Sequence, residues 1–175
     1  MGMEHMINVD IFLAVVTFVA AIFDYRFRKV PNAITLPAIG IGLSIAFLNN
    51  GLLGFSASMI GFFFGTVLLS FPYAMGGIGA GDVKLLGAIG AIKGPWFVFM
   101  AFLAAAIIGG IMAVFRMAFI LKNSDMRILG QSVRTACYTG TLSEVEIPEY
   151  ARKETLPYAV AISAGAVVAL ILEMR

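Results

Sequence analysis

The sequence predicts an all-α, polytopic integral membrane protein with about six transmembrane helices. Of its 175 residues, 61% are hydrophobic and only 13% are charged, whereas about a quarter of the residues in soluble domains are charged. The mean hydropathy is +0.97. The twelve basic and ten acidic side chains are also gathered in a few stretches. They cannot cover a water-soluble surface, which excludes ordinary cytosolic enzymes and secreted disulfide scaffolds.

Six apolar segments predict the membrane helices, each of which needs about 20 apolar residues to cross a bilayer. We expect these helices at 6–23, 33–48, 52–75, 83–92, 95–121 and 156–172. The fourth is short, so we expect a thin or re-entrant helix packed inside the bundle, where protein surrounds it. The stretch 122–155 is predicted to be a cytoplasmic loop. One membrane domain is expected to take in residues 1–175.

Lysine and arginine predict the orientation, because they favour the cytoplasmic side of short loops. With the N-terminus outside, ten of the twelve cations fall on the cytoplasmic side, and only Lys93 and Arg175 fall outside. Without the short fourth crossing, Arg152 and Lys153 would lie on the wrong side. We therefore expect six crossings of the cytoplasmic membrane with both termini outside. The net charge of +2 gives no reason to expect a nucleic-acid partner.

Few residues in this sequence can carry chemistry. Cys137 is the only cysteine and His5 the only histidine, so we expect no disulfide, no histidine-dependent triad, no metal and no cofactor. Two aspartates stand at the borders of apolar segments. Asp24 ends the first segment and Asp82 begins the fourth, and the predicted topology takes both to the cytoplasmic face.

Two carboxyl groups at one site predict the chemistry of an aspartic protease. Because two like charges cannot both ionise cheaply, such a pair holds one proton near neutral pH. The ionised member takes a proton from water as the water attacks a peptide carbonyl, and the protonated member donates to the carbonyl oxygen. The glycines at 76, 77, 79 and 81 disfavour a continuous helix before Asp82 and let an extended peptide approach the main chain.

Each of these residues also has a structural alternative. Asp24 can form a local ion pair with Arg26 and the cations that follow it, and Asp82 can be the N-cap of the next helix. Asp10 is expected at the outer interface. Lys84 is either an interface anchor or a group that tunes the Asp82 carboxylate. For the whole chain, an ion-coupled transporter and a non-catalytic membrane scaffold are the alternative functions.

Two stretches carry a family resemblance, namely Asp24-Tyr-Arg-Phe-Arg-Lys-Val-Pro-Asn32 and Gly79-Ala-Gly-Asp-Val-Lys-Leu-Leu86. In this order in a small polytopic chain, they resemble the two active-site motifs of the type IV prepilin peptidases, which are membrane aspartic proteases of the GxGD type. The resemblance implies that Asp24 and Asp82 are the catalytic pair and that Gly79 and Gly81 shape the loop of the second motif. The other motif residues expected around the active site and the substrate are Arg26, Pro31, Asn32 and Lys84.

The resemblance also implies the substrates and partners. Members of this family remove the short basic leader from prepilins and pseudopilins at the cytoplasmic face, so such proteins and the lipid bilayer are the expected partners. Larger members carry an N-terminal domain with paired cysteines and also N-methylate the new terminus. Here 23 residues precede Asp24 and cysteine pairs are absent, so methylation is not expected. The chain resembles the short form found with Tad or Flp pili and the related archaeal preflagellin peptidases.

Overall fold

The computed structural model describes residues 3–123 and 158–173, and no strand occurs within these ranges. Its helices are α1 (Met3–Phe27), α2 (Asn32–Ala74), α3 (Ala80–Lys93), α4 (Pro95–Asn123) and α7 (Tyr158–Glu173). The all-α prediction is therefore confirmed for the described chain. One compact unit takes in 1–109 and 157–175, and a second takes in 110–156. Of the second unit, the structure describes only the end of α4, so nearly all of the predicted loop at 122–155 lies outside the described residues.

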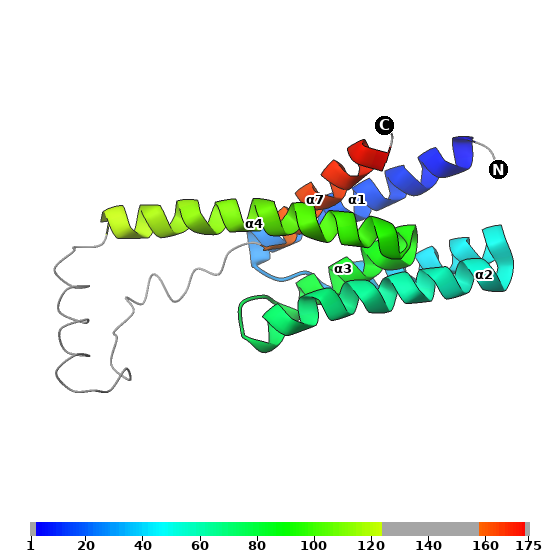
Figure 1. Cartoon of the computed structure of the whole chain (residues 1–175), viewed down its shortest axis with the longest axis horizontal. Helices are drawn as coiled ribbons and strands as arrows, with labels where there is room; N and C mark the ends of the chain where they lie inside the picture. The colour runs from blue at the N-terminus through cyan, green and yellow to red at the C-terminus, as the bar shows by residue number, and fades with distance from the viewer. Residues whose placement is uncertain (1–2, 124–157, 174–175) are drawn as a thin grey trace. The chain divides into compact units, whose positions relative to one another are not determined.

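The long helix α2 is a helical hairpin that bends at Asn50 and Gly51 (Figure 1). Gly51 has a φ of 60°, a backbone conformation that glycine adopts without steric cost. Beyond the bend, Gly54 lies against the carbonyl of Ala46. Residues eight apart in a straight helix are separated by about 12 Å along its axis, so this contact requires the two halves to fold back on each other. The halves match the predicted segments 33–48 and 52–75.

Helix α3 is the central element of the larger unit. Most of its residues are buried, and Leu85, Leu86 and Ile89 are completely so. Its 14 residues give a length of about 21 Å, which is less than the hydrocarbon thickness of about 30 Å. The prediction of a short helix enclosed by the bundle is confirmed. An apolar helix with no polar face is stable where protein surrounds it.

Small residues let the two halves of α2 lie close to α3. Gly61 lies against the main chain of Gly90, and a Cβ on Gly42 would lie 3.1 Å from the carbonyl oxygen of Ala91. The Ser58 hydroxyl donates a hydrogen bond to that same Ala91 carbonyl. This close approach maximises van der Waals contact, which is the main source of helix association in a bilayer.

Helices α1 and α7 lie side by side in the larger unit (Figure 1). The Ser163 hydroxyl of α7 donates to the Thr17 carbonyl of α1 at 2.7 Å. The outer face of α1 is apolar. Four apolar residues at helical spacing form a stripe along it, and each of them is 48–66% exposed. These residues are Ile11, Val15, Phe18 and Ile22. Apolar side chains both inside and outside the bundle are typical of a protein surrounded by lipid.

The structure supports the membrane assignment but not the full count of crossings. Among the described residues, three helices are long and apolar enough to span, within 8–27, 32–74 and 95–116, and α7 is a shorter apolar helix. The count of six crossings is not confirmed by helix length and composition. It depends on whether the halves of α2, together with α3 and α7, cross separately.

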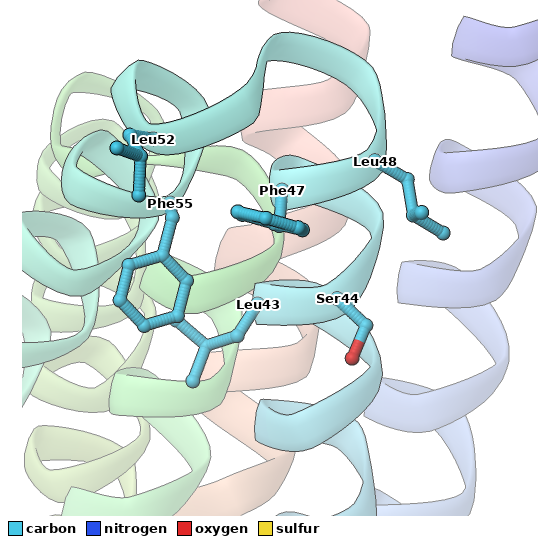
Figure 2. A pocket seen from close by; sticks show the side chains of 6 residues that line it. All are labelled: Leu43, Ser44, Phe47, Leu48, Leu52 and Phe55. Carbon is cyan, nitrogen blue, oxygen red and sulfur yellow. The ribbon is translucent and has the colours of Figure 1, made fainter.

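An apolar hollow lies at the bend of α2, with a cavity volume of about 450 Å³. Its lining residues are Leu43, Ser44, Phe47, Leu48, Leu52 and Phe55. Figure 2 shows Phe47 and Phe55 facing each other from the two sides of the bend, with ring centroids 6.4 Å apart in an edge-to-face arrangement. The lining contains no ionisable side chain, so this hollow offers no group for acid, base or nucleophilic chemistry.

An ion-pair triad joins three helices at one end of the larger unit. The Nζ of Lys93 lies 2.7 Å from a carboxylate oxygen of Asp10 and 2.7 Å from one of Glu173. Lys93 ends α3, Glu173 ends α7 and Asp10 lies in the first half of α1. Helices α3 and α7 therefore run in the same direction and α1 runs opposite to both. Asp10 and Lys93, which were both predicted for the outer side, lie together.

The contact between α2 and α3 predicts that Gly61→Ala destabilises the protein. A Cβ at position 61 would overlap the Gly90 main chain, and overpacking of this kind costs about 1–3 kcal/mol. Gly40→Ala is the matched control, because a Cβ there has no atom within 4 Å and alanine favours a helix. Thermal unfolding in detergent should show a lower midpoint for Gly61→Ala only. Equal midpoints for the two variants would contradict the packing.

The triad predicts a second stability effect. Lys93→Met leaves the carboxylates of Asp10 and Glu173 without their cation. We expect the free energy of unfolding to fall by about 1–3 kcal/mol after allowance for partial exposure. The triple variant Lys93→Met, Asp10→Asn, Glu173→Gln removes the uncompensated charges and should recover much of the loss. Thermal unfolding measures both. A triple variant no more stable than Lys93→Met would show that the loss does not come from unpaired charge.

Candidate active site

Asp24 lies within the last turn of α1. The helix continues to Phe27, one turn beyond the predicted end at residue 23, so Asp24 is part of the helix and does not follow it. The side chain is 6% exposed. Its Oδ2 accepts a hydrogen bond of 3.0 Å from the backbone N–H of Ala159, in the first turn of α7. The N–H groups of a first helical turn have no acceptor within their own helix, so this bond satisfies both partners.

The local ion pair considered for Asp24 does not form. Neither Arg26 nor Arg28 comes within ion-pair distance of Asp24 in the described structure, although Arg28 is near enough to act on it electrostatically. Arg26 is exposed, and its guanidinium lies 5.9 Å from the centre of the Phe27 ring. Arg26 therefore lies on the chain beside the site but makes no contact with the carboxyl group.

Asp82 lies in the first turn of α3 and is also 6% exposed. Its Oδ2 accepts a hydrogen bond of 3.2 Å from the backbone N–H of Gly79. The N-cap residue is Gly79, so Asp82 caps the helix from inside the first turn and is not itself the N-cap. Gly81 lies in the first turn of α3, and its role in shaping the loop of the second motif remains a prediction. The non-helical chain is the shorter run before Ala80, in which Gly76 has a φ of 77°.

Gly81 brings the two predicted motifs together. A Cβ there would lie 3.0 Å from the Cβ of Val30 and 3.1 Å from its carbonyl oxygen, so the missing side chain lets the segment after α1 lie against the start of α3. The Lys84 Nζ donates to the Asn32 Oδ1 at 2.9 Å, which joins the motifs a second time. Pro31 is the N-cap residue of α2. Lys84 and Asn32 therefore connect the two segments that carry the aspartates.

The two carboxyl groups lie within electrostatic reach of each other. Asp82 lies outside the three long apolar helices, and burial raises its pKa to about 6, with a further contribution from the negative charge of Asp24. The hydrogen bond from Gly79 acts in the opposite direction. The Asp82 Oδ1 is buried and has no hydrogen-bond partner among the described residues. A buried carboxyl pair with a raised pKa can supply both a general base and a general acid near neutral pH.

The start of α7 is a part of the site that sequence reasoning missed. The Ala159 N–H bonds to Asp24, and Tyr158 lies within electrostatic range of Asp82. The segment 156–172 was expected only to cross the membrane. Pro157 is typical of a helix start, but no sequence signal pairs that start with Asp24. Within the described ranges, no group of three or more His, Cys, Asp or Glu could hold a metal ion.

A helical membrane protein that buries two acidic side chains together at one site has the arrangement expected of a membrane aspartic peptidase. A family model described as the type IV leader peptidase family matches residues 11–114. The match covers more than half of the chain and includes both Asp24 and Asp82. The chain therefore belongs to the type IV leader peptidase family.

A curated relative from Bacillus subtilis (strain 168), described as a prepilin leader peptidase/N-methyltransferase, is 28% identical over 175 residues. The alignment covers 96% of this chain and 58% of the relative, so the chain spans less than two thirds of that protein's length. No solved structure matches the chain significantly.

The raised pKa of Asp82 predicts a pH-dependent stability. The folded-state pKa is about 6 against an ordinary value of 3.8, so the folded protein binds this proton more tightly than the unfolded chain does. The resulting stabilisation is complete below about pH 4 and is lost as the pH rises through 6. Asp82→Asn abolishes this loss, so its free energy of unfolding should exceed that of the wild type by about 1–3 kcal/mol above pH 7.

Thermal unfolding of both proteins from pH 4 to pH 8 measures the effect. The two stabilities should converge as the pH falls toward 4, where the Asp82 carboxyl group is neutral and resembles the asparagine amide in shape. Parallel pH profiles would show that Asp82 does not titrate differently in the folded and unfolded protein.

Proposed function

We propose that this chain is an aspartic endopeptidase that removes the leader peptide of type IV prepilins and pseudopilins, with Asp24 and Asp82 as its catalytic pair. The observation that carries the proposal is the burial of both motif aspartates at one site, where the negative charge of Asp24 acts on Asp82. Both lie in terminal turns of their helices. This position favours a peptidase at the membrane border over a transporter, whose site would lie at the midplane.

The proposed reaction needs one water and one shared proton. The ionised aspartate removes a proton from the water as its oxygen attacks the scissile carbonyl, and the protonated aspartate donates to the carbonyl oxygen. The chain before α3 is not helical, so a substrate in extended form can approach its backbone. Gly79 contributes its N–H to Asp82, and Gly81 gives the room that lets Val30 lie beside it.

We place the site at the cytoplasmic face of the inner membrane, in a chain that crosses six times with both termini outside. The crossing segments lie in α1, the two halves of α2, α3, α4 and α7, and the fourth crosses over 83–92, so that Asp82 lies at its border and outside it. The distribution of lysine and arginine supports this orientation. The triad of Lys93, Asp10 and Glu173 supports the alternation, because it requires α1 to run opposite to α3 and α7.

The proposed substrates are Flp-like prepilins or related preflagellins, which have a short basic leader before a hydrophobic helix. The motif resemblance supports this class, and the name of the Bacillus relative refers to prepilins. We propose that the bilayer and these substrates are its partners and that nucleic acid is not. The expectation that the new N-terminus stays unmethylated remains a prediction, and so does the single-domain arrangement of residues 1–175.

Co-expression with a Flp-type prepilin tests the proposal. Asp24→Asn and Asp82→Asn should each reduce leader removal by about 10³-fold or more, because each variant lacks one of the two proton-transfer groups. A gel shift follows cleavage, and the mass of the new N-terminus shows whether it is methylated.

Asp10→Asn is the matched control for this assay. It removes a carboxylate from the same helix as Asp24, in the triad, and should still process the substrate. Detergent gel filtration confirms that each variant is folded. Efficient cleavage by Asp24→Asn or Asp82→Asn would overturn the aspartic mechanism, and a wild type that cleaves no prepilin would overturn the substrate class.

A further inference from the structure

Asp24 and Asp82 have different surroundings, although the proposed chemistry requires only that one of them be ionised. Asp24 Oδ2 accepts a buried hydrogen bond of 3.0 Å from the Ala159 N–H. This donor belongs to the first turn of a 16-residue helix, where the unpaired N–H groups and the helix dipole both favour negative charge. A hydrogen bond to a charged acceptor is about twice as strong as one between neutral groups. The start of α7 therefore favours the carboxylate form of Asp24.

Some of the charged and titratable groups around Asp24 favour its carboxylate form, and others disfavour it. Arg28, from the segment after α1, is the cation that acts on it. Asp82 faces it from α3, and Tyr158 lies beside the pair at the start of α7. The C-terminal end of α1 disfavours a carboxylate in its last turn. Burial and the end of its own helix therefore disfavour an ionised Asp24, and the Ala159 N–H and Arg28 are the groups that favour it.

Asp82 is less well prepared to be an anion. Its Oδ1 is buried without a hydrogen-bond partner among the described residues, and its Oδ2 accepts one longer bond, from Gly79. The start of α3 favours negative charge, but a buried anionic oxygen without a donor costs more than a neutral one. The raised pKa of Asp82 agrees with this difference. A protonated Asp82 also has an O–H group that no described residue engages.

We infer that the N-terminus of α7 holds Asp24 as the ionised member of the pair, so that Asp82 carries the shared proton and donates it to the substrate carbonyl. This inference rests on the proposed peptidase function and assigns a separate role to each aspartate. The Ala159 N–H is a positioning group, because it contacts Asp24 and not the substrate.

The assignment gives a balanced reaction. The water oxygen bonds to the scissile carbon while one water proton moves to Asp24 and the Asp82 proton moves to the carbonyl oxygen. The carbon–nitrogen bond then breaks as Asp24 gives its proton to the leaving nitrogen. One hydroxyl of the tetrahedral intermediate returns a proton to Asp82. The pair ends in its starting state, with Asp24 ionised and Asp82 protonated.

The pH dependence of cleavage distinguishes the two possible assignments. If Asp24 is the anion, weakening its support raises the pH at which the pair takes up a second proton, which moves the acidic limb of the rate profile upward. The basic limb, where Asp82 loses its proton, does not move, because Asp24 is ionised on both sides of that step. If Asp24 instead carries the shared proton, the same change moves only the basic limb.

The full-length protein in proteoliposomes, with a purified Flp-type prepilin as the probe, makes the measurement. Ala159→Pro removes the N–H without breaking a bond inside α7, and Ala159→Gly keeps it. Arg28→Gly removes the cation and suits the φ of 54° at that position, and Arg28→Lys keeps the charge.

We expect the acidic limb to move upward by about one pH unit in Ala159→Pro and by less in Arg28→Gly, because Arg28 is exposed. The limb should not move in either conservative control. Movement of the basic limb, or unchanged profiles in both variants, would overturn the assignment.

A second readout does not need cleavage. Infrared difference spectroscopy at about pH 5, below the pKa of Asp82 and above an ordinary carboxyl pKa, should show a protonated carboxyl band that Asp82→Asn removes and Asp24→Asn retains. The reverse pattern would overturn the assignment. Failure of the wild type to cleave any prepilin would count against the proposed function alone, because this band still reports which aspartate holds the proton.

Discussion

The common direction of α3 and α7 is the constraint on which the rest of the site depends. Both helices begin beside the aspartates, and both end beside Lys93. Helix starts favour negative charge and helix ends favour positive charge, so the starts of α3 and α7 favour the carboxyl pair and the end of α3 favours the lysine. The end of α1 already lies beside the aspartates. If α3 or α7 ran in the opposite direction, the end of a second helix would lie there in place of a helix start.

This arrangement is possible because α3 is short and closely packed. Gly61 and Gly90 let the returning half of α2 approach the α3 backbone, and the central position of α3 places Asp82 in the interior although it lies only three residues into its helix. Gly81 does the same for the segment that follows Asp24. Small side chains therefore determine how near the two motifs come, while the aspartates supply the chemistry.

The sequence predicts the parts of this site that depend on local composition. Apolar runs predicted the helices, the separate segments 33–48 and 52–75 predicted the two halves of α2, and the acids at segment borders predicted the pair. It failed where a feature depends on contacts between distant segments. The Ala159 N–H is a main-chain donor that every sequence contains, so only the fold could bring it to Asp24. Gly81 was expected to shape a loop because glycine disfavours a helix, but it lies in the first turn of α3, where its missing side chain leaves room for Val30.

The contacts at the two ends of α3 explain how the bundle tolerates the buried carboxyl group of Asp82, whose ionisation destabilises the fold. Asp82 Oδ1 is buried without a donor, which destabilises the folded protein whenever Asp82 is ionised. The same lack of a partner leaves the Asp82 proton available for transfer.

At the other end of α3, Lys93 bonds to two carboxylates from different helices and so connects α1 and α7 to α3 far from the carboxyl pair. The ion pairs that stabilise the bundle and the carboxyl pair that destabilises it are thus separated by the length of one helix. An asparagine in place of Asp82 would remove the cost of a buried negative charge, but it would also remove the proton that we assign to catalysis. Selection for stability alone would therefore not retain an aspartate at this position.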